Sequence, residues 1–169
     1  SEYVTLARNI LKNGVFSMDQ EPPFRPDYFR TPGYPLFLVP ILYFFKSAYA
    51  VSLTQIILAA ATAFLIFKIG ERVASPAAGI TAVFLYVMNP STLLYSMTVM
   101  SDMLFVFLLV SAVYLMFFLE SRRAKLLMLA SGLLIGFDAL VRPVGLFLPV
   151  PLIFFYFFFK IKTGVSPKK

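Results

Sequence analysis

The sequence from Gln20 to Pro35 reads Gln-Glu-Pro-Pro-Phe-Arg-Pro-Asp-Tyr-Phe-Arg-Thr-Pro-Gly-Tyr-Pro. This stretch contains five prolines, two arginines and two carboxylates, and the chain then passes directly into apolar sequence. Proline fixes φ and removes a backbone donor, so neither a helix nor a central strand tolerates prolines this dense. We therefore expect a shaped polar loop at the edge of a membrane, held in place by the hydrophobic sequence that follows.

The composition indicates a multi-span membrane protein. The chain is 60% hydrophobic and 14% charged, whereas a soluble domain has about 45–50% apolar and about 25% charged residues. Five windows are long and nearly uncharged, a pattern typical of transmembrane helices. The expected fold class is all-α, a polytopic integral membrane helical bundle.

The chain contains no Cys and no His. This excludes disulfides and thiolate metal sites, leaves the compartment undecided, and removes the commonest general base and zinc ligand. Acid–base chemistry would therefore fall to Asp, Glu, Tyr or Lys. The motifs of soluble enzymes, such as GxGxxG, a P-loop or a Ser–His arrangement, are absent, so we do not expect a nucleotide held in a glycine-rich loop.

The net charge of +7 is explained better by membrane orientation than by nucleic-acid binding, because the basic residues lie near span ends. Nine of the fifteen gather at one set of ends, which we expect to be cytoplasmic: Lys68, Arg72, Arg122, Arg123, Lys125, Lys160, Lys162, Lys168 and Lys169. The remaining six fall on the other side with six of the eight acids: Arg8, Lys12, Arg25, Arg30, Lys46 and Arg142, with Glu2, Asp19, Glu21, Asp27, Asp102 and Asp138.

Residues 1–33 are expected to form a non-cytoplasmic region that begins with an amphipathic helix in the plane of the interface. In Ser1–Gly14, one face carries Tyr3, Ala7, Ile10 and Leu11, opposite Thr5, Arg8, Asn9 and Lys12. Gly14 is the predicted C-terminal stop. The chain starts at Ser1 with no Met and no apolar signal region, so we expect it to be a piece of a longer protein.

Residues 34–162 form the predicted transmembrane region, and residues 163–169 a cytoplasmic tail. Tyr34–Phe45 is broken by Pro35 and Pro40 and is too short to cross about 30 Å of hydrocarbon at about 1.5 Å per residue. We expect it to be re-entrant or partly inserted, because a full span there would turn the basic loops outward, against the positive-inside rule. About five full spans follow: Tyr49–Phe67, Ala77–Met100, Met103–Leu119, Leu126–Val141 and Val144–Phe159.

Asp102, after Ser101 at the junction of two spans, is a candidate site residue, because a charge near the membrane costs free energy. It is equally interpreted as part of a polar turn in which Ser101 or Asp102 caps the next helix, and the two roles do not exclude each other. Arg30, in the opening loop, either binds a ligand or snorkels to lipid headgroups.

Asp138 and Arg142 are spaced i, i+4, so one helix would bring them together as an ion pair. Arg142-Pro143 should end that span, because the residue before proline avoids the helical region. Arg142 would still offer a planar fork suited to phosphate. Gly132 and Gly136 have the GxxxG spacing, which predicts close helix packing.

Three stretches, taken in order, carry a family resemblance. They are Glu2-Tyr3-Val-Thr-Leu-Ala7-Arg-Asn-Ile-Leu-Lys-Asn-Gly14, then Arg30-Thr-Pro-Gly-Tyr-Pro-Leu-Phe37, then Ser101-Asp102-Met-Leu-Phe together with Gly132 through Leu140-Val-Arg142-Pro143. This order resembles the protein O-mannosyltransferase and aminoarabinose-transferase group of membrane glycosyltransferases, which have the C-type fold.

The resemblance implies an active site on the non-cytoplasmic face, where a polyprenyl-phosphate sugar gives its glycosyl group to a protein, lipid or glycan acceptor. It implies Glu2 and Asp102 as catalytic residues and Arg30, Tyr34 and Arg142 as substrate-binding residues, with no protein metal site and the need for a divalent metal left open. The expected location is the plasma membrane of a prokaryote. The family's essential Asp precedes the residue that Tyr3 resembles, so we expect it upstream of Ser1, with Glu2 as the substitute within this chain.

A multi-span transporter or lipid-binding protein without chemistry is the alternative. Broken helices and intramembrane charges suit transporters too, but the five predicted spans show no inverted repeat. An Asp within a few residues upstream of Ser1 would favour the enzyme.

Overall fold

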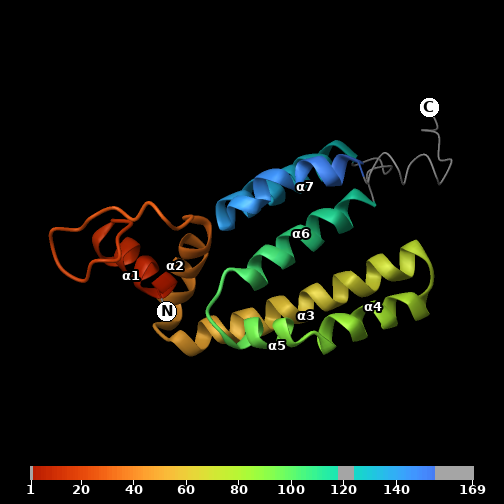
Figure 1. The fold of residues 1–169 in the computed structure, drawn as a ribbon, viewed down its shortest axis with the longest axis horizontal. Helices are drawn as coiled ribbons and strands as arrows, with labels where there is room; N and C mark the ends of the chain where they lie inside the picture. The colour runs from red at the N-terminus through yellow and green to blue at the C-terminus, as the bar shows by residue number, and fades with distance from the viewer. Residues whose placement is uncertain (1, 118–123, 155–169) are drawn as a thin grey trace.

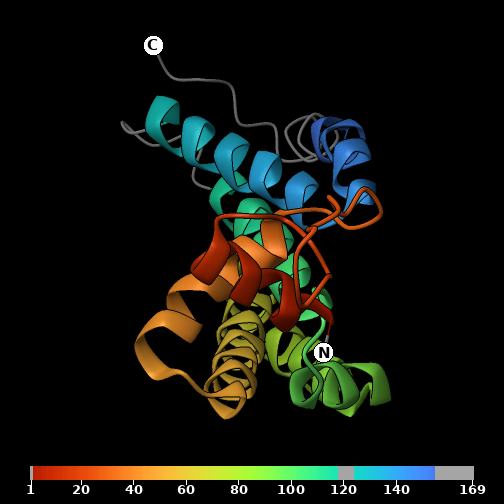
Figure 2. The same cartoon turned by 90° about the vertical axis from the view of Figure 1, so that its left-hand side faces the viewer.

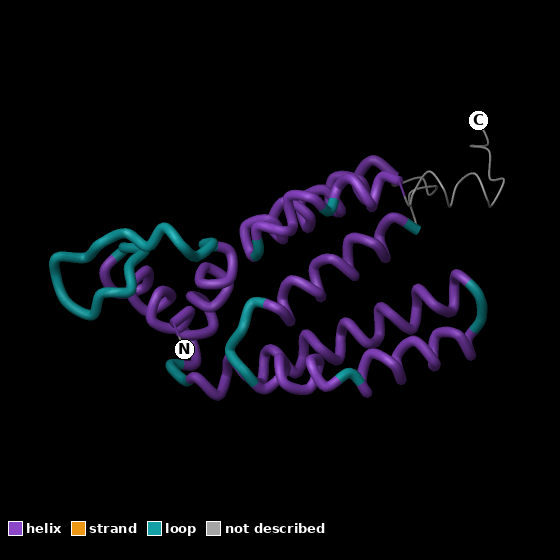
Figure 3. Tube along the Cα trace, in the orientation of Figure 1, coloured by secondary structure: helices purple, strands orange, loops and turns teal. Residues whose placement is uncertain are grey.

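The computed structural model describes residues 2–117 and 124–154, and within them every regular element is a helix. An isolated bridge between Ser17 and Pro26 is the one extended pairing in these ranges. The fold is therefore the predicted all-α membrane bundle (Figures 1 and 3). The elements are α1 (Glu2–Asn13), α2 (Gly33–Phe45), α3 (Ala48–Val73), α4 (Pro76–Met88), α5 (Pro90–Met97), α6 (Asp102–Met116), α7 (Ala124–Val141) and the 3-10 helix η1 (Pro143–Phe147).

The long helices run side by side and the first two helices lie at one end of them. α3 packs on α4 and on α6, and α6 packs on α7, which gives the elongated bundle of Figure 1. α1 packs on α2, and α2 in turn contacts α3 and α7. The view in Figure 2 looks at that end, where α1 and the loop after it cover the ends of the long helices.

Within the described residues, two helices are long and apolar enough to cross a membrane, Tyr49–Val73 within α3 and Ala124–Val141, which is α7. The predicted span Ala77–Met100 is not one continuous helix. The structure forms α4 and α5 there, bent by 62°, because Asn89 caps α5 by accepting a hydrogen bond from the Ser91 N–H (2.9 Å) and Pro90 cannot continue the donor ladder. The bent pair counts as a third candidate span among the described residues.

Three other apolar stretches are shorter. α2 has 13 residues and α6 has 15, so the structure agrees with the prediction that Tyr34–Phe45 is short for a span. The predicted spans Met103–Leu119 and Val144–Phe159 run into residues 118–123 and 155–169, which lie outside the described residues. After η1, residues 149–154 are again helical.

α1 begins and ends close to where the sequence predicts. Gly14 adopts the left-handed φ of 66° that ends it, and its N–H donates to the Ile10 carbonyl (3.1 Å). The predicted buried face is partly wrong, because Asn9 is buried while Leu11 is exposed. The Asn9 amide donates to the carbonyls of Ser17 (2.7 Å) and Asp19 (2.8 Å), so it holds the returning loop and is satisfied there.

Close packing occurs at glycines other than the predicted pair. A β-carbon on Gly33 would lie 2.5 Å from the backbone carbon of Leu140, and one on Gly70 would lie 2.6 Å from the Gly79 Cα. These contacts bring α2 against α7 and α3 against α4. Around Gly132 and Gly136 no such atom lies within 4 Å, so the packing predicted from their GxxxG spacing is not formed by the described residues.

Candidate functional site

The charged residues of the described chain divide between the two ends of the bundle, as the sequence predicts. α3 and α6 begin, and α7 ends, at the end where α1 and α2 lie (Figure 1). This end therefore carries Glu2, Asp27, Arg30, Asp102 and Arg142. The opposite end carries the last turn of α3, with Lys68 and Arg72, and the first turn of α7, with Lys125.

Arg30 joins the proline-rich loop to α1. Its Nη2 donates to Glu2 Oε2 and its Nη1 to Asp27 Oδ2, each at 2.6 Å. Asp27 Oδ1 also accepts from the backbone N–H groups of Phe29 (2.8 Å) and Arg30 (3.1 Å). Burial raises the pKa of Asp27, but the Phe29 N–H and the Arg30 guanidinium outweigh it and hold that pKa below its ordinary value.

Arg142 joins α7 to α6. Its Nη1 donates to Asp102 Oδ1 in a close ion pair, and its guanidinium lies over the Phe105 ring, 5.8 Å from the ring centre. Asp102 is in the first turn of α6, where the helix dipole favours a negative charge. The Arg142 side chain stays 41% exposed, so it holds Asp102 and still presents donors to solvent.

Two contacts join the chain segments that carry the two arginines. Thr31 Oγ1 donates to the Val141 carbonyl at 2.7 Å, and these are the residues next to Arg30 and Arg142 in the chain. Gly33 packs directly on the backbone of Leu140 and Val141. The part of the loop that carries Arg30 and the end of α7 that carries Arg142 are therefore in contact, and we call this region the arginine surface.

A buried hydrogen bond network supports this surface from beneath. Gln55 Nε2 donates to the Tyr34 hydroxyl (3.0 Å) and to the Met100 carbonyl (2.8 Å). Tyr34 is fully buried, packed edge-on against Tyr3 with ring centres 5.0 Å apart. Tyr34, predicted to bind substrate, thus presents no surface to a ligand in this structure and supports the fold of the site.

The predicted ion pair between Asp138 and Arg142 is wrong. Arg142 has an extended backbone (φ −145°, ψ 135°), as predicted for a residue before proline, and this turns its side chain off the helix face that carries Asp138 and toward α6. Asp138 is fully buried and neither carboxylate oxygen has a hydrogen bond partner among the described residues. Ser101, one of the two residues predicted to cap α6, precedes that helix without a capping hydrogen bond from its side chain.

Sequence reasoning missed Gln55 and Thr31. A signal for Gln55 was present, because it is a polar side chain inside the long apolar run of α3, and intramembrane polar groups need partners. Thr31 gave no signal, since a hydroxyl beside prolines in a loop is ordinary.

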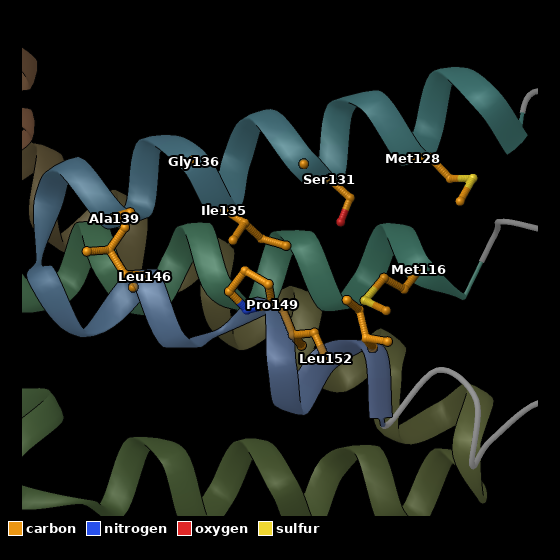
Figure 4. Close-up of a pocket in the computed structure, with 12 residues that line it drawn as sticks. Met116, Met128, Ser131, Ile135, Gly136, Ala139, Leu146, Pro149 and Leu152 are labelled. Carbon is orange, nitrogen blue, oxygen red and sulfur yellow. The ribbon is translucent and has the colours of Figure 1, made fainter.

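An apolar cavity of about 620 Å³ lies between the end of α6, α7 and the helical segment after it (Figure 4). Gly132, Gly136 and Ala139 line one side, and Leu146, Pro149 and Leu152 the other. Ser131 contributes a hydroxyl that already donates to the Ala112 carbonyl (3.3 Å). The cavity has no charged lining residue and is separate from the arginine surface.

No group of three or more Asp and Glu side chains able to hold a metal ion occurs within residues 2–117 and 124–154. Three carboxylates at the site end are instead engaged by arginines in two separate sets, Glu2 and Asp27 by Arg30 and Asp102 by Arg142. The arrangement is suited to holding an anion beside carboxylates, because each arginine has donors beyond those its partners use.

Comparison with known proteins identifies the family. No curated protein and no solved structure matches the chain. A family model described as dolichyl-phosphate-mannose-protein mannosyltransferase matches residues 30–168, a range that includes Arg30, Asp102 and Arg142 and leaves out Glu2 and Asp27. The resemblance drawn from the sequence motifs is confirmed. Because the match covers most of the chain, this protein belongs to the dolichyl-phosphate-mannose-protein mannosyltransferase family and is a membrane protein of the glycosyltransferase type.

Proposed function

We propose that this chain forms the donor-phosphate site of a glycosyltransferase that moves a sugar from a polyprenyl-phosphate donor to an acceptor on the non-cytoplasmic face of a membrane. The observation that supports the proposal is the Thr31–Val141 contact, which joins the chain segments next to Arg30 and Arg142. Mannose on the donor and a protein as acceptor are the first candidates, because the family description names both. The plasma membrane of a prokaryote is the proposed location.

In the proposed reaction the bond between the sugar C1 and the donor phosphate oxygen breaks, and a bond forms between C1 and the acceptor oxygen. Polyprenyl phosphate leaves as an anion, so the guanidinium groups of Arg30 and Arg142 stabilise charge that grows in the transition state. The proton of the acceptor hydroxyl passes to a carboxylate.

The two carboxylates predicted as catalytic have different settings. The Glu2 side chain is 65% exposed beside Arg30, whereas that of Asp102 is 18% exposed and engaged by Arg142. We assign Glu2 as the proton acceptor within this chain and Asp102 as a positioning residue for Arg142.

The test is transfer by the full-length protein in nanodiscs with a panel of polyprenyl-phosphate sugars, starting from mannose. Lys keeps the charge of Arg and loses its planar fork, so Arg30→Lys and Arg142→Lys should each lower turnover by roughly tenfold or more, the equivalent of a charged hydrogen bond of about 1.5–3 kcal/mol. Arg8→Lys, on exposed α1 surface, is the matched control and should transfer normally.

The carboxylate roles are separated by kinetics. Glu2→Gln should lower kcat with donor KM unchanged, whereas Asp102→Asn should raise donor KM as well, because it frees Arg142. Normal turnover in all the arginine variants, Ala included, would remove the phosphate-binding role. Transport of the lipid without transfer of its sugar would favour a transporter instead.

The proposed orientation has its own test, helped by the absence of native Cys. Glu21→Cys, in the exposed loop, should react with an impermeant thiol reagent from outside the cell. Val73→Cys, at the exposed C-terminal end of α3, should react only after permeabilisation. The reverse pattern would place the site on the cytoplasmic face and contradict the proposal.

A further inference from the structure

The proline-rich loop turns two neighbouring aromatic side chains outward. Tyr28 is 85% exposed and Phe29 is 95% exposed. In the same turn the charged groups point inward, since the Asp27 side chain is only 5% exposed. Leaving two adjacent aromatic rings in water forfeits the favourable free energy of burying their apolar surface, several kcal/mol at about 25 cal/mol per Å². This indicates that the rings contact something other than water.

The rings are held outward by a fixed turn. Asp27 Oδ1 accepts the N–H groups of Phe29 and Arg30, and Arg30 Nη1 closes the turn onto Asp27 Oδ2 at 2.6 Å. The Asp27 N–H donates to the Phe16 carbonyl at 2.9 Å, which fastens the turn to the segment after α1. The aromatic pair is thus preorganised and needs little ordering when it meets its partner.

The tether to α7 sets the height of this turn relative to the membrane. Thr31 bonds the carbonyl of Val141, the last residue of a helix that is apolar and long enough to span. Phe29 is two residues from Thr31, at most about 7 Å of chain. The backbone of the turn therefore lies near the end of this candidate span, where hydrocarbon would give way to headgroups.

The surroundings match that level. η1, which follows Arg142, also leaves Val144 and Phe147 exposed, by 52% and 73%, so the chain just after α7 carries exposed apolar side chains as well. Arg25, exposed in the same loop as the aromatic pair, can pair with anionic headgroups. Aromatic side chains are enriched at this depth in membrane proteins.

We infer that Tyr28 and Phe29 form an aromatic anchor that inserts into the headgroup region of the bilayer beside the arginine surface. The anchor fixes the proline-rich loop to the membrane at one edge, while Thr31 and Arg30 fix it to the bundle at the other. A lipid-linked donor diffusing in the bilayer would meet the loop at this edge.

The chain has no Trp, so a Phe29→Trp variant of the intact protein carries a single indole at the anchor, provided the flanking segments also lack Trp or have it replaced by Phe. In nanodiscs of phosphatidylcholine and phosphatidylglycerol, its emission should be blue-shifted. Phosphatidylcholine brominated near the top of the acyl chains should quench it more than lipid brominated near the chain ends, and acrylamide should quench it weakly. Tyr28→Trp is the second reporter if Phe29→Trp does not fold.

Glu21→Trp, exposed in the same loop, is the matched control and should emit as a solvated indole that acrylamide quenches. If Phe29→Trp and Tyr28→Trp behave like this control, the anchor does not exist. If brominated lipid leaves them unchanged and an acceptor peptide alone protects them from acrylamide, the pair is an acceptor surface and the lipid proposal is overturned. These fluorescence measurements need no transfer activity, so they test the anchor independently of the proposed function.

Discussion

The C-terminal end of α7 and the middle of α7 have opposite surroundings, although both are apolar sequence. Near its C-terminus the backbone of Leu140 and Val141 touches Gly33, and the Val141 carbonyl accepts from Thr31. Near its middle, Gly132 and Gly136 have no heavy atom within 4 Å of an added β-carbon and line an apolar cavity. The C-terminal region is held by backbone contacts and hydrogen bonds and carries the arginine surface. The middle leaves apolar groups for lipid or further chain to cover.

The largest expected effect tests this contrast directly with one substitution in each region. Gly33→Ala places a methyl group 2.5 Å from the backbone of Leu140, which cannot shift without moving α7. The substitution should therefore lower the free energy of unfolding by about 1–3 kcal/mol and separate the loop from α7. Gly136→Ala has open space and sits inside a helix, so it should raise that free energy by about 0.5–1 kcal/mol. Unfolding in mixed micelles with increasing dodecyl sulfate measures both, and equal responses would contradict the contrast.

A second test removes the hydrogen bonds beneath the arginine surface. Gln55→Leu deletes the donor that serves both Tyr34 and the Met100 carbonyl, leaving buried acceptors without it, and should destabilise by about 1–3 kcal/mol. Thr54→Val is the neighbouring control, because the Thr54 hydroxyl donates only to the Ala50 carbonyl of its own helix (2.8 Å). The same micelle titration applies, and similar losses in the two variants would show that Gln55 has no special role.

A third test asks which carboxylate is coupled to Arg142. In double-mutant cycles, Asp102→Ala with Arg142→Ala should show a coupling of about 0.5–3 kcal/mol, whereas Asp138→Leu with Arg142→Ala should be additive within about 0.5 kcal/mol. Asp138→Leu alone should stabilise by about 1 kcal/mol, because it removes a buried carboxylate without a partner. A strong coupling to Asp138 would restore the pair predicted from the i, i+4 spacing.

The smallest effect concerns pH and the loop. The folded-state pKa of Asp27 lies below its ordinary value of 3.8, so its contribution is fully present above that value and is lost as the pH falls through the folded-state pKa. The protection factor of the Phe29 amide, the intrinsic hydrogen exchange rate relative to the observed rate at the same pH, should therefore be constant from neutral pH down to about pH 4 and fall below it. Asp27→Asn should remove this dependence, and loosening that begins near neutral pH would rule out Asp27 as its cause.

Much of the fold was predictable because it follows local rules. Gly14 ends α1, Pro143 ends α7 and forces Arg142 into an extended backbone, and the dense prolines before Gly33 exclude regular structure. Each of these depends on the φ, ψ and donor chemistry of a few consecutive residues. The placement of most acidic residues at one end, and of Lys68, Arg72 and Lys125 at the other, follows from their order in the chain. Hydropathy likewise gave α3 and α7, since an apolar run of span length is a property of the sequence alone.

The partners within the site were decided by tertiary structure. Helical periodicity shows that Asp138 and Arg142 are four residues apart and could lie on one helix face. The extended backbone at Arg142 and the position of α6 lead Arg142 to form its ion pair with Asp102 instead. The burial of Tyr34 and the contact of Gly33 with α7 likewise depend on where neighbouring helices lie. The sequence by itself determined the helices, their ends and the end of the bundle that carries the charges. Only the packing of one helix on another decided which charged side chains form ion pairs, because ion pairing depends on distances between residues far apart in the chain.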